Sequence, residues 1–276
     1  MPQVSRTTIK KIDAATVTDT SDLLATEEPM EIRVEYGPAG KRIQKNISVT
    51  MRTPGNDEEL ATGFLFTEAI VTDAKDIVAV TRPKKDNEGV VLVSLAENVT
   101  LEASSLERNF YTTSSCGVCG KASIEAVRTA CNIPDSFDNL RIPATLIYQL
   151  PGLLRRQQEV FENTGGLHAC ALFDSSGKLV LSREDVGRHN ALDKLIGAAL
   201  NDGMIPLDNH ILLLSGRASF ELVQKAVMAG IKIVAAVGAP SSLAAEMAEE
   251  WGMTLIGFLR GERFNIYSGA ERIEVT

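Results

Sequence analysis

Two cysteines lie two residues apart in the stretch TSSCGVCGK, which covers residues 113–121. Cys116 and Cys119 are each followed by a glycine, which leaves the backbone flexible and the sulfur atoms approachable. Lys121 follows closely, and a helix is predicted to begin there. A nearby ammonium and a helix N-terminus both favour the thiolate, the reactive form of cysteine. The pair is therefore a candidate for thiol chemistry.

Three chemistries suit a close cysteine pair. A zinc site needs two further ligands, and the chain offers Cys131, Cys170 and its histidines, without a second CxxC. A thioredoxin-like redox pair is expected at a strand-to-helix junction, whereas this pair follows a loop. A persulfide relay needs one exposed thiolate on a mobile loop, with a second thiol to help release the sulfur. The relay fits position and composition best, and the other two stay open. Cys131 and Cys170 are expected to be structural.

A second group of candidate residues follows strands in the second half of the chain, where ligands of α/β domains collect. The four turns concerned are residues 182–190, 215–219, 237–242 and 258–263. The first three place backbone N–H groups at helix N-termini, which bind anions. The arginines of these turns, which suit bidentate phosphate contacts, are Arg188, Arg217, Arg260 and Arg263.

Together these turns predict a pocket for a nucleotide or a phosphorylated cofactor, although any one of them could simply connect two elements. The chain contains neither the GxxxxGK[ST] pattern of a P-loop nor the GxGxxG pattern of a Rossmann fold.

Two histidines lie beside these turns. His168 precedes a strand behind two glycines, and His189 lies at a predicted helix start with Glu184, Asp185 and Arg188. This polar cluster either pairs charges and caps the helix or orients groups around a ligand. The remaining histidine, His210, is expected to be a surface or capping residue.

The elements of the first half are predicted from hydrophobic periodicity. The first ~25 residues are polar and are expected to form a frayed tail. Strands are predicted at 31–37, 41–54, 76–83 and 89–97, with a helix at 55–70. These elements indicate a small α+β domain at residues 1–135, which ends in the CGVC loop and its helix.

From residue 136 to 276 helices and strands alternate, which is typical of an α/β domain with helices on both faces of one sheet. Helices are predicted at 144–161, 187–203, 220–230 and 242–252, and strands at 168–174, 178–184, 209–216, 231–239 and 253–261. The first two strands should form a hairpin, and the later strands should be parallel.

Composition narrows the class of protein. The 276 residues are 44% hydrophobic and 23% charged, the profile of a soluble globular chain. The net charge of −8 argues against a generic nucleic-acid or membrane surface. Neither a membrane span nor a signal peptide is recognised, and four cysteines make no disulfide framework. We therefore expect a cytoplasmic protein.

Six segments resemble the motifs of a known family, in their residues and in their order along the chain. They are ELATGFLFTEAIV, CGVCG, TGGLHACALF, EDVGRHNALDKL, SGRASFELVQKA and LIGFLRGERFNIY. The chain resembles the formate dehydrogenase accessory sulfurtransferases, the FdhD family, from about residue 27 to residue 273. The combination of EDVGRHNALDK with CGVCG is specific to that resemblance.

The resemblance implies a function. Members carry sulfur from a cysteine desulfurase to the molybdenum cofactor of formate dehydrogenase, in its bis(molybdopterin guanine dinucleotide) form. It also implies a cytidine-deaminase-like C-terminal domain and a homodimer. Cys116 corresponds to the persulfide carrier and Cys119 to the second cysteine of the motif. The segment that corresponds to the family's cofactor-binding residues comprises Phe258, Leu259, Arg260, Gly261, Glu262 and Arg263. Here Glu262 adds a negative charge to a segment that is often richer in small residues.

The implied fold raises the possibility of zinc-dependent deamination, which uses H-x-E and P-C-x-x-C elements. His168 is followed by Ala169 and Cys170 rather than by a glutamate at the third position, and no proline precedes Cys116. Deamination is therefore not expected, and no metal is assigned. Two hypotheses remain: a sulfurtransferase, and a chaperone that binds the cofactor and the apo-enzyme without sulfur chemistry.

Overall fold

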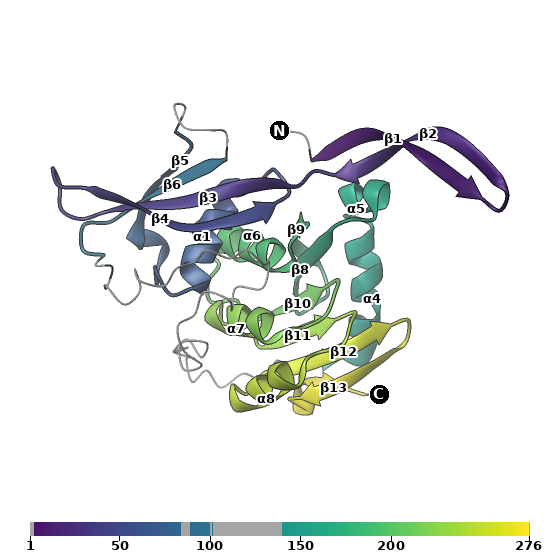
Figure 1. The fold of residues 1–276 in the computed structure, drawn as a ribbon. Coiled ribbons are helices and arrows are strands. Elements are labelled where there is room, and N and C mark those ends of the chain that lie inside the picture. Colours follow the sequence, from purple (N-terminus) through teal and green to yellow (C-terminus); the bar gives the residue numbers. More distant parts are fainter. Residues whose placement is uncertain (1–2, 84–88, 100, 102–139, 276) are drawn as a thin grey trace.

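A computed structural model describes residues 3–83, 89–99, 101 and 140–275 (Figure 1). The CGVC loop and the helix predicted after it lie outside the described residues, as does Cys131. None of the helices in the described parts of the chain is long and apolar enough to cross a membrane.

The largest sheet has six strands in the order β13-β12-β11-β10-β8-β9. Its strands are β8 (His168–Asp174), β9 (Leu179–Asp185), β10 (His210–Leu214), β11 (Ile233–Ala236), β12 (Thr254–Arg260) and β13 (Arg263–Ser268). Strands β8 and β9 form the predicted hairpin, and β10, β11 and β12 are parallel, as predicted. Strand β13 was not predicted, and it pairs antiparallel with β12 at the sheet edge.

Helices cover both faces of this sheet (Figure 1). On one face lie α6 (Arg188–Asn201), α7 (Phe220–Met228) and α8 (Ser242–Glu250), and on the other lies α4 (Ala144–Arg155). Alternate strand residues enter the two buried clusters: Leu212 and Leu214 face the first three helices, and Ile211 and Leu213 face α4. This confirms a mixed α/β fold, and its likeness to cytidine deaminases stays a prediction.

The helix predicted at 144–161 is divided in two. Helix α4 contains Pro151 and ends at Arg155, and the short α5 (Glu159–Thr164) follows and ends at Gly165 in the left-handed conformation. The other short elements are β7 (Ile142–Pro143), β14 (Ile273–Glu274), which pairs with β7, and the 3-10 turns η1 (Ala74–Asp76) and η2 (Ala270–Arg272).

The N-terminal part contains a four-stranded sheet in the order β4-β3-β6-β5, together with helix α1 (Asp57–Thr67). Its strands are β3 (Glu28–Tyr36), β4 (Ile43–Arg52), β5 (Ile77–Thr81) and β6 (Val90–Leu95), all near the predicted positions. Met30 of β3 and Leu60 of α1 lie in the same buried cluster as Leu195 of α6. The two parts thus share one apolar core, and a division at residue 135 stays a prediction.

Helices α1 and α6 cross at two glycines. A Cβ atom on Gly63 would lie 2.8 Å from the backbone nitrogen of Gly197 and 2.7 Å from the backbone carbon of Asp193. Real Cβ atoms do not approach backbone that closely, so the two helices are in backbone contact at this crossing. This contact fixes the first residues of α6, which line the candidate site, relative to the N-terminal sheet.

The frayed tail predicted for the first 25 residues is wrong. Strands β1 (Val4–Asp13) and β2 (Thr16–Ala25) form a hairpin of ten residue pairs that projects from the body (Figure 1). The backbone N–H of Thr26 donates to the carbonyl of Gln3 at its base. The segment is polar, but it is rich in threonine and other β-branched residues, which favour strands even when they are exposed.

Candidate functional site

The polar turns predicted at the strand ends do lie together. The turn after β10 and the turn after β11 are joined by backbone hydrogen bonds, because Gly238 N–H donates to Gly216 O at 2.9 Å and Ser241 N–H donates to Ala218 O at 3.0 Å. The end of β12 joins them, since Phe258 N–H donates to Gly238 O at 3.0 Å. Three cavities in the described part of the protein are lined by residues of these turns or of the end of β12.

The first cavity, of about 220 Å³, is here called the arginine cavity. It is lined by Arg188, Arg217, Ala218, Ser219, Ala239, Pro240 and Ser241. Helices α6, α7 and α8 begin at this point, so three helix N-termini and two guanidinium groups meet there. The Nε atom of Arg188 is buried and has no hydrogen-bond partner among the residues that the structure describes. The arrangement suits an anion such as a phosphate.

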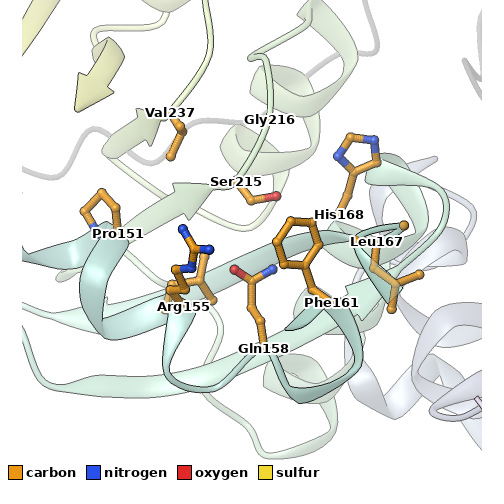
Figure 2. Close-up of a pocket in the computed structure, with 12 residues that line it drawn as sticks. Pro151, Arg155, Gln158, Phe161, Leu167, His168, Ser215, Gly216 and Val237 are labelled. Carbon is orange, nitrogen blue, oxygen red and sulfur yellow. The ribbon is translucent and has the colours of Figure 1, made fainter. Parts of the chain in front are cut away.

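The second cavity, of about 450 Å³, lies on the α4 side of the sheet and is here called the α4 cavity (Figure 2). Its walls are Pro151, Leu154, Arg155, Gln158, Phe161, Gly165, Gly166, Leu167, His168, Ser215, Gly216 and Val237. Most of these residues are apolar, with a few polar groups between them, as in many sites for small organic ligands.

His168 lines the α4 cavity. Burial and the positive charges of Arg188 and Arg217 lower the pKa of its imidazole, against the opposing effect of Asp185. The ring is therefore neutral at pH 7. Gly216 lies against it, since a Cβ atom there would be 3.3 Å from Nδ1 of His168. Neutral imidazole can accept or pass on a proton in this position.

The third cavity, of about 280 Å³, lies at the β12–β13 turn and is lined by Phe258, Arg260, Arg263 and Asn265. Phe258 has a positive φ of 54°, which is rare for a bulky residue, at an irregularity in the pairing of β12 with β13. Its side chain is 42% exposed. The cavity thus combines an exposed ring with two cations.

Four of the six predicted cofactor residues have exposed side chains or line this third cavity, namely Phe258, Arg260, Glu262 and Arg263. Gly261 forms the turn with a φ of 56°, and Leu259 is fully buried among the apolar residues beneath the sheet. Leu259 therefore anchors the segment rather than facing a ligand. The assignment of the segment to cofactor binding stays a prediction.

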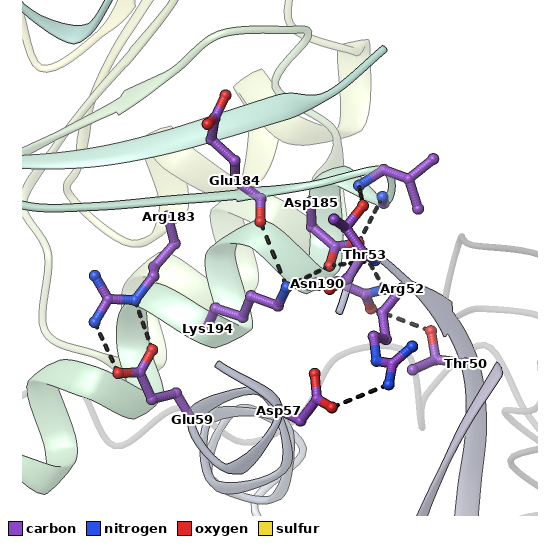
Figure 3. Close-up of polar contacts among 12 residues, drawn as sticks. Thr50, Arg52, Thr53, Asp57, Glu59, Arg183, Glu184, Asp185, Asn190 and Lys194 are labelled. Carbon is purple, nitrogen blue, oxygen red and sulfur yellow. Dashed lines mark hydrogen bonds and ion pairs between the residues drawn. The ribbon is translucent and has the colours of Figure 1, made fainter. Parts of the chain in front are cut away.

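The EDVGRHNALDK motif is divided between the site and the interior. Lys194 and Asp185 are both buried, with 2.7 Å between Nζ and Oδ2, and Lys194 also donates to the carbonyl of Thr53 at 2.8 Å (Figure 3). Thr53 N–H donates back to Asp185 at 3.1 Å, and Asn190 donates to the carbonyl of Met51 at 2.8 Å. Asp185 thus pairs with Lys194, which lies outside the cluster considered in the sequence, and the pair fastens the end of β4 to α6.

A second buried cluster forms around Asp193, the residue before Lys194 in α6. Lys225 of α7 donates to Asp193 at 2.9 Å and to Thr67 of α1 at 2.8 Å, with Glu68 at 3.5 Å. Burial alone would lower the pKa of the Lys225 ammonium, but the Asp193 and Glu68 carboxylates together raise it above its ordinary value. Lys225 therefore stays charged and joins three helices.

The other predicted residues lie as follows. Cys170 is buried in β8, and burial raises the pKa of its thiol far above the ordinary value, so it is structural, as predicted. His189 is buried, with Nε2 3.4 Å from the hydroxyl of Ser219 at the start of α7. His210 is half-buried at the start of β10. Among the described residues, no group of three histidine, cysteine or acidic side chains is placed to hold a metal ion. Cys116 and Cys119 lie outside the described residues, so their roles stay predictions.

The sequence analysis missed Arg155, Gln158 and Phe161, which line the α4 cavity. The available signal was the polar run RRQQ at residues 155–158, which follows the apolar part of the predicted helix.

Comparisons with known proteins agree on one family. Residues 25–274 match the family model described as the FdhD/NarQ family. A protein named sulfur carrier protein FdhD from Streptomyces coelicolor is 48% identical over 97% of this chain and 95% of its own length. Proteins of the same name from Mycobacterium tuberculosis and Sulfurisphaera tokodaii are 46% and 44% identical, covering 96% and 98% of this chain and 96% and 99% of their own.

A solved structure from Desulfotalea psychrophila, described as a candidate formate dehydrogenase accessory protein, has a similar fold. The TM-score is 0.78 at 24% identity, and the match covers 99% of this chain and 100% of that one.

Proposed function

Since this chain belongs to the FdhD/NarQ family, we propose that it is a sulfur carrier that serves formate dehydrogenase. In this proposal a cysteine desulfurase supplies the sulfur, and the molybdenum cofactor in its bis(molybdopterin guanine dinucleotide) form is the acceptor substrate. The chain acts in the cytoplasm as a homodimer. The observation that carries the proposal is the 46% to 48% sequence identity, over nearly the full length of the chain, to proteins named sulfur carriers, together with the CGVCG segment.

In the first step Cys116 takes up sulfur. Its thiolate attacks the terminal sulfur of the desulfurase persulfide, and the S–S bond of that persulfide breaks. The electron pair of the broken bond leaves on the desulfurase cysteine as a thiolate. Cys116 then carries a persulfide, and no net oxidation or reduction has occurred. Gly117 and Gly120 give the segment its freedom to move between donor and acceptor.

In the second step Cys119 releases the sulfur. Its thiolate attacks the inner sulfur of the Cys116 persulfide, which forms a Cys116–Cys119 disulfide and expels the terminal sulfur as sulfide. The two electrons that reduce this sulfur come from the two cysteines, which a cellular thiol must reduce again before the next cycle.

The acceptor substrate is held at the strand ends. Its diphosphate groups suit the arginine cavity, where Arg188, Arg217 and three helix N-termini concentrate positive charge. Arg260 and Arg263 at the third cavity offer a second pair of cations. The buried Nε of Arg188, which lacks a hydrogen-bond partner among the described residues, supports anion binding at this position.

The test separates transfer from binding. After incubation of the protein with a cysteine desulfurase and cysteine, we expect a mass increase of about 32 Da, one sulfur atom, on Cys116. Cys116→Ala should lose this adduct and fail to activate formate dehydrogenase, yet it should bind the cofactor as the wild type does. Cys170→Ala, which removes only a buried thiol, is the matched control and should keep the adduct.

A persistent absence of the adduct would favour the alternative, a chaperone that binds the cofactor and the apo-enzyme through the same cavities. Zinc found in the purified protein at one ion per chain would instead favour a structural role for Cys116 and Cys119.

A further inference from the structure

The β1–β2 hairpin lies apart from the candidate site, and almost all of it precedes residue 25, where the match to the family model begins. It projects from the body with only its base against helix α5 (Figure 1). A two-stranded hairpin surrounded by water is marginally stable, whereas three or more strands support one another. The outer part of the hairpin would therefore gain stability from further strands.

Strand β1 has a free edge that can accept such a strand. Within the described residues β1 pairs only with β2, whereas β2 also contacts α5. The backbone N–H of Thr26 donates to the carbonyl of Gln3 at the base of the hairpin. Because opposite residues of antiparallel strands alternate between bonded and non-bonded pairs, the peptide groups of every second residue of β1 point away from β2. These residues are Val4, Arg6, Thr8, Lys10 and Ile12.

The charges of the hairpin indicate what covers this edge. Its cations are Arg6, Lys10 and Lys11, and its anions are Asp13, Asp19 and Asp22, so the hairpin is neutral while the chain carries −8. A neutral hairpin does not attract a strongly charged partner, but it can meet its own copy without net repulsion. Ten residues of strand span about 34 Å, so two copies joined through their hairpins hold their acidic bodies further apart than the Debye length of about 8 Å. Charge thus favours a second copy of this chain.

The cations of β1 restrict how two such strands can pair about a two-fold axis. An axis at Thr8 would place Arg6 opposite the partner's Lys10. An axis at Lys10 or at Lys11 would place that residue opposite the same residue of the partner. Like charges directly opposite each other destabilise a sheet. An axis at Ile9 places no cation opposite another.

An axis at Ile9 also gives the longest overlap of the remaining registers, from residue 5 to residue 13, since an axis nearer the base or the tip shortens it. Ile9, which is half-buried, then meets the partner's Ile9 in a non-bonded pair, where side chains approach most closely. At the tip, Ile12 and Val17 form a cross-strand pair and are 72% and 60% exposed. In this register Ile12 lies opposite the partner's Arg6, whose aliphatic stem can cover it.

We propose that the β1 strands of two copies pair antiparallel about a two-fold axis at Ile9, so that two hairpins form one sheet in the order β2-β1-β1-β2. The same edge serves both copies, so the assembly closes as a dimer and does not grow into a fibre. The proposal rests on the homodimer of the proposed function and identifies the surface that holds it. About eight backbone hydrogen bonds join the two strands in this register.

Two proline variants test the edge. Thr8 and Ser21 lie opposite each other in a non-bonded pair of the hairpin, and both are exposed. Their N–H groups point outward, so proline at either position removes no hydrogen bond within the hairpin. Thr8→Pro blocks the β1 edge and should weaken the dimer at least tenfold, whereas Ser21→Pro alters the other edge and should leave it unchanged. Sedimentation velocity of the full chain over a range of concentrations measures the dissociation constant.

A cross-linking experiment tests the register. The variant Ile9→Cys is made in a chain in which Cys116, Cys119 and Cys131 are replaced by alanine. Opposed Cα atoms of a non-bonded pair lie about 4.5 Å apart, within the range of a disulfide, so mild oxidation should give a covalent dimer. Lys11→Cys is the control on the same face of the same strand. Its two copies would be about 13 Å apart and should not cross-link.

The outcomes separate this inference from the proposed function. A wild type that stays at 29.8 kDa at every concentration would overturn both the inference and the homodimer, whereas the sulfur adduct on Cys116 tests sulfur transfer independently. A dimer that Thr8→Pro and Ser21→Pro affect equally would overturn the inference alone. Absence of the Ile9→Cys cross-link, or equal cross-linking of Lys11→Cys, would do the same. A monomer that needs the hairpin to bind formate dehydrogenase would assign the edge to that partner and also refute the proposal.

Discussion

Replacing Gly63 by alanine tests the helix crossing that holds the candidate site. The added Cβ would lie 2.8 Å from the backbone nitrogen of Gly197 and 2.7 Å from the backbone carbon of Asp193. Backbone atoms cannot turn aside as a flexible side chain can, so α1 and α6 must separate. Overpacking of this kind costs up to about 3 kcal/mol. At about 2 to 4 °C per kcal/mol for a chain of this size, this upper value lowers the midpoint of thermal unfolding by about 6 to 12 °C.

Gly152→Ala is the matched control, because Gly152 is an exposed glycine within helix α4 and its added Cβ would meet nothing within 4 Å. Alanine there should stabilise the protein by about 0.5 to 1 kcal/mol through its better helix propensity. The same substitution in two helices should therefore change stability in opposite directions. Urea and thermal unfolding of both variants provide the measurement. A Gly63→Ala protein as stable as the wild type would refute the close crossing of α1 and α6.

Two further predictions concern charge. Lys225→Met leaves the buried Asp193 carboxylate without its ammonium partner and should lower the free energy of unfolding, measured in urea, by about 3 to 5 kcal/mol. Adding Asp193→Leu should restore most of this stability. Equal losses in the single and double variants would contradict the pairing. The imidazole of His168 should titrate by NMR below its ordinary pKa of 6.5, because the folded protein disfavours its protonated form. The free energy of unfolding should therefore rise with pH between the lowered pKa and 6.5, and His168→Gln should flatten that slope; an unchanged slope would count against the assignment.

Periodicity predicted the elements that have a buried face, and it failed where burial is slight. Strands β10 and β11 are continuous apolar runs, because helices cover both faces of the sheet, and the sequence therefore located them well. The β1–β2 hairpin has mostly exposed residues, so its pattern carries little apolar signal, and its stability comes from pairing and β-branched side chains. Strand β13 was missed for a similar reason, since it alternates exposed and partly buried residues at a sheet edge.

Site residues could be predicted from the sequence where their type and their position after a strand indicated a role. They could not be predicted where the role depends on contacts with residues distant in the sequence. Arg188 and Arg217 were identified because they follow strands and precede helices. The role of Asp185 depends on Lys194 and on the backbone of Thr53, which is 132 residues away in the chain, and no local pattern predicts that contact. Gln158 was missed because its contact with Glu184 joins residues 26 positions apart in the chain.

The turn at residues 237–241 lines two of the cavities and holds the strand end beside the third, and its centre has little room for a side chain. A Cβ atom on Gly238 would lie 3.0 Å from the backbone of Arg217, and the carbonyl of Gly238 holds the end of β12. Substitutions that retune one cavity through this turn also disturb the other two. The three cavities are therefore expected to change together when this turn changes. Residues of α4 and α5, which line only the α4 cavity among the three, can vary without that effect.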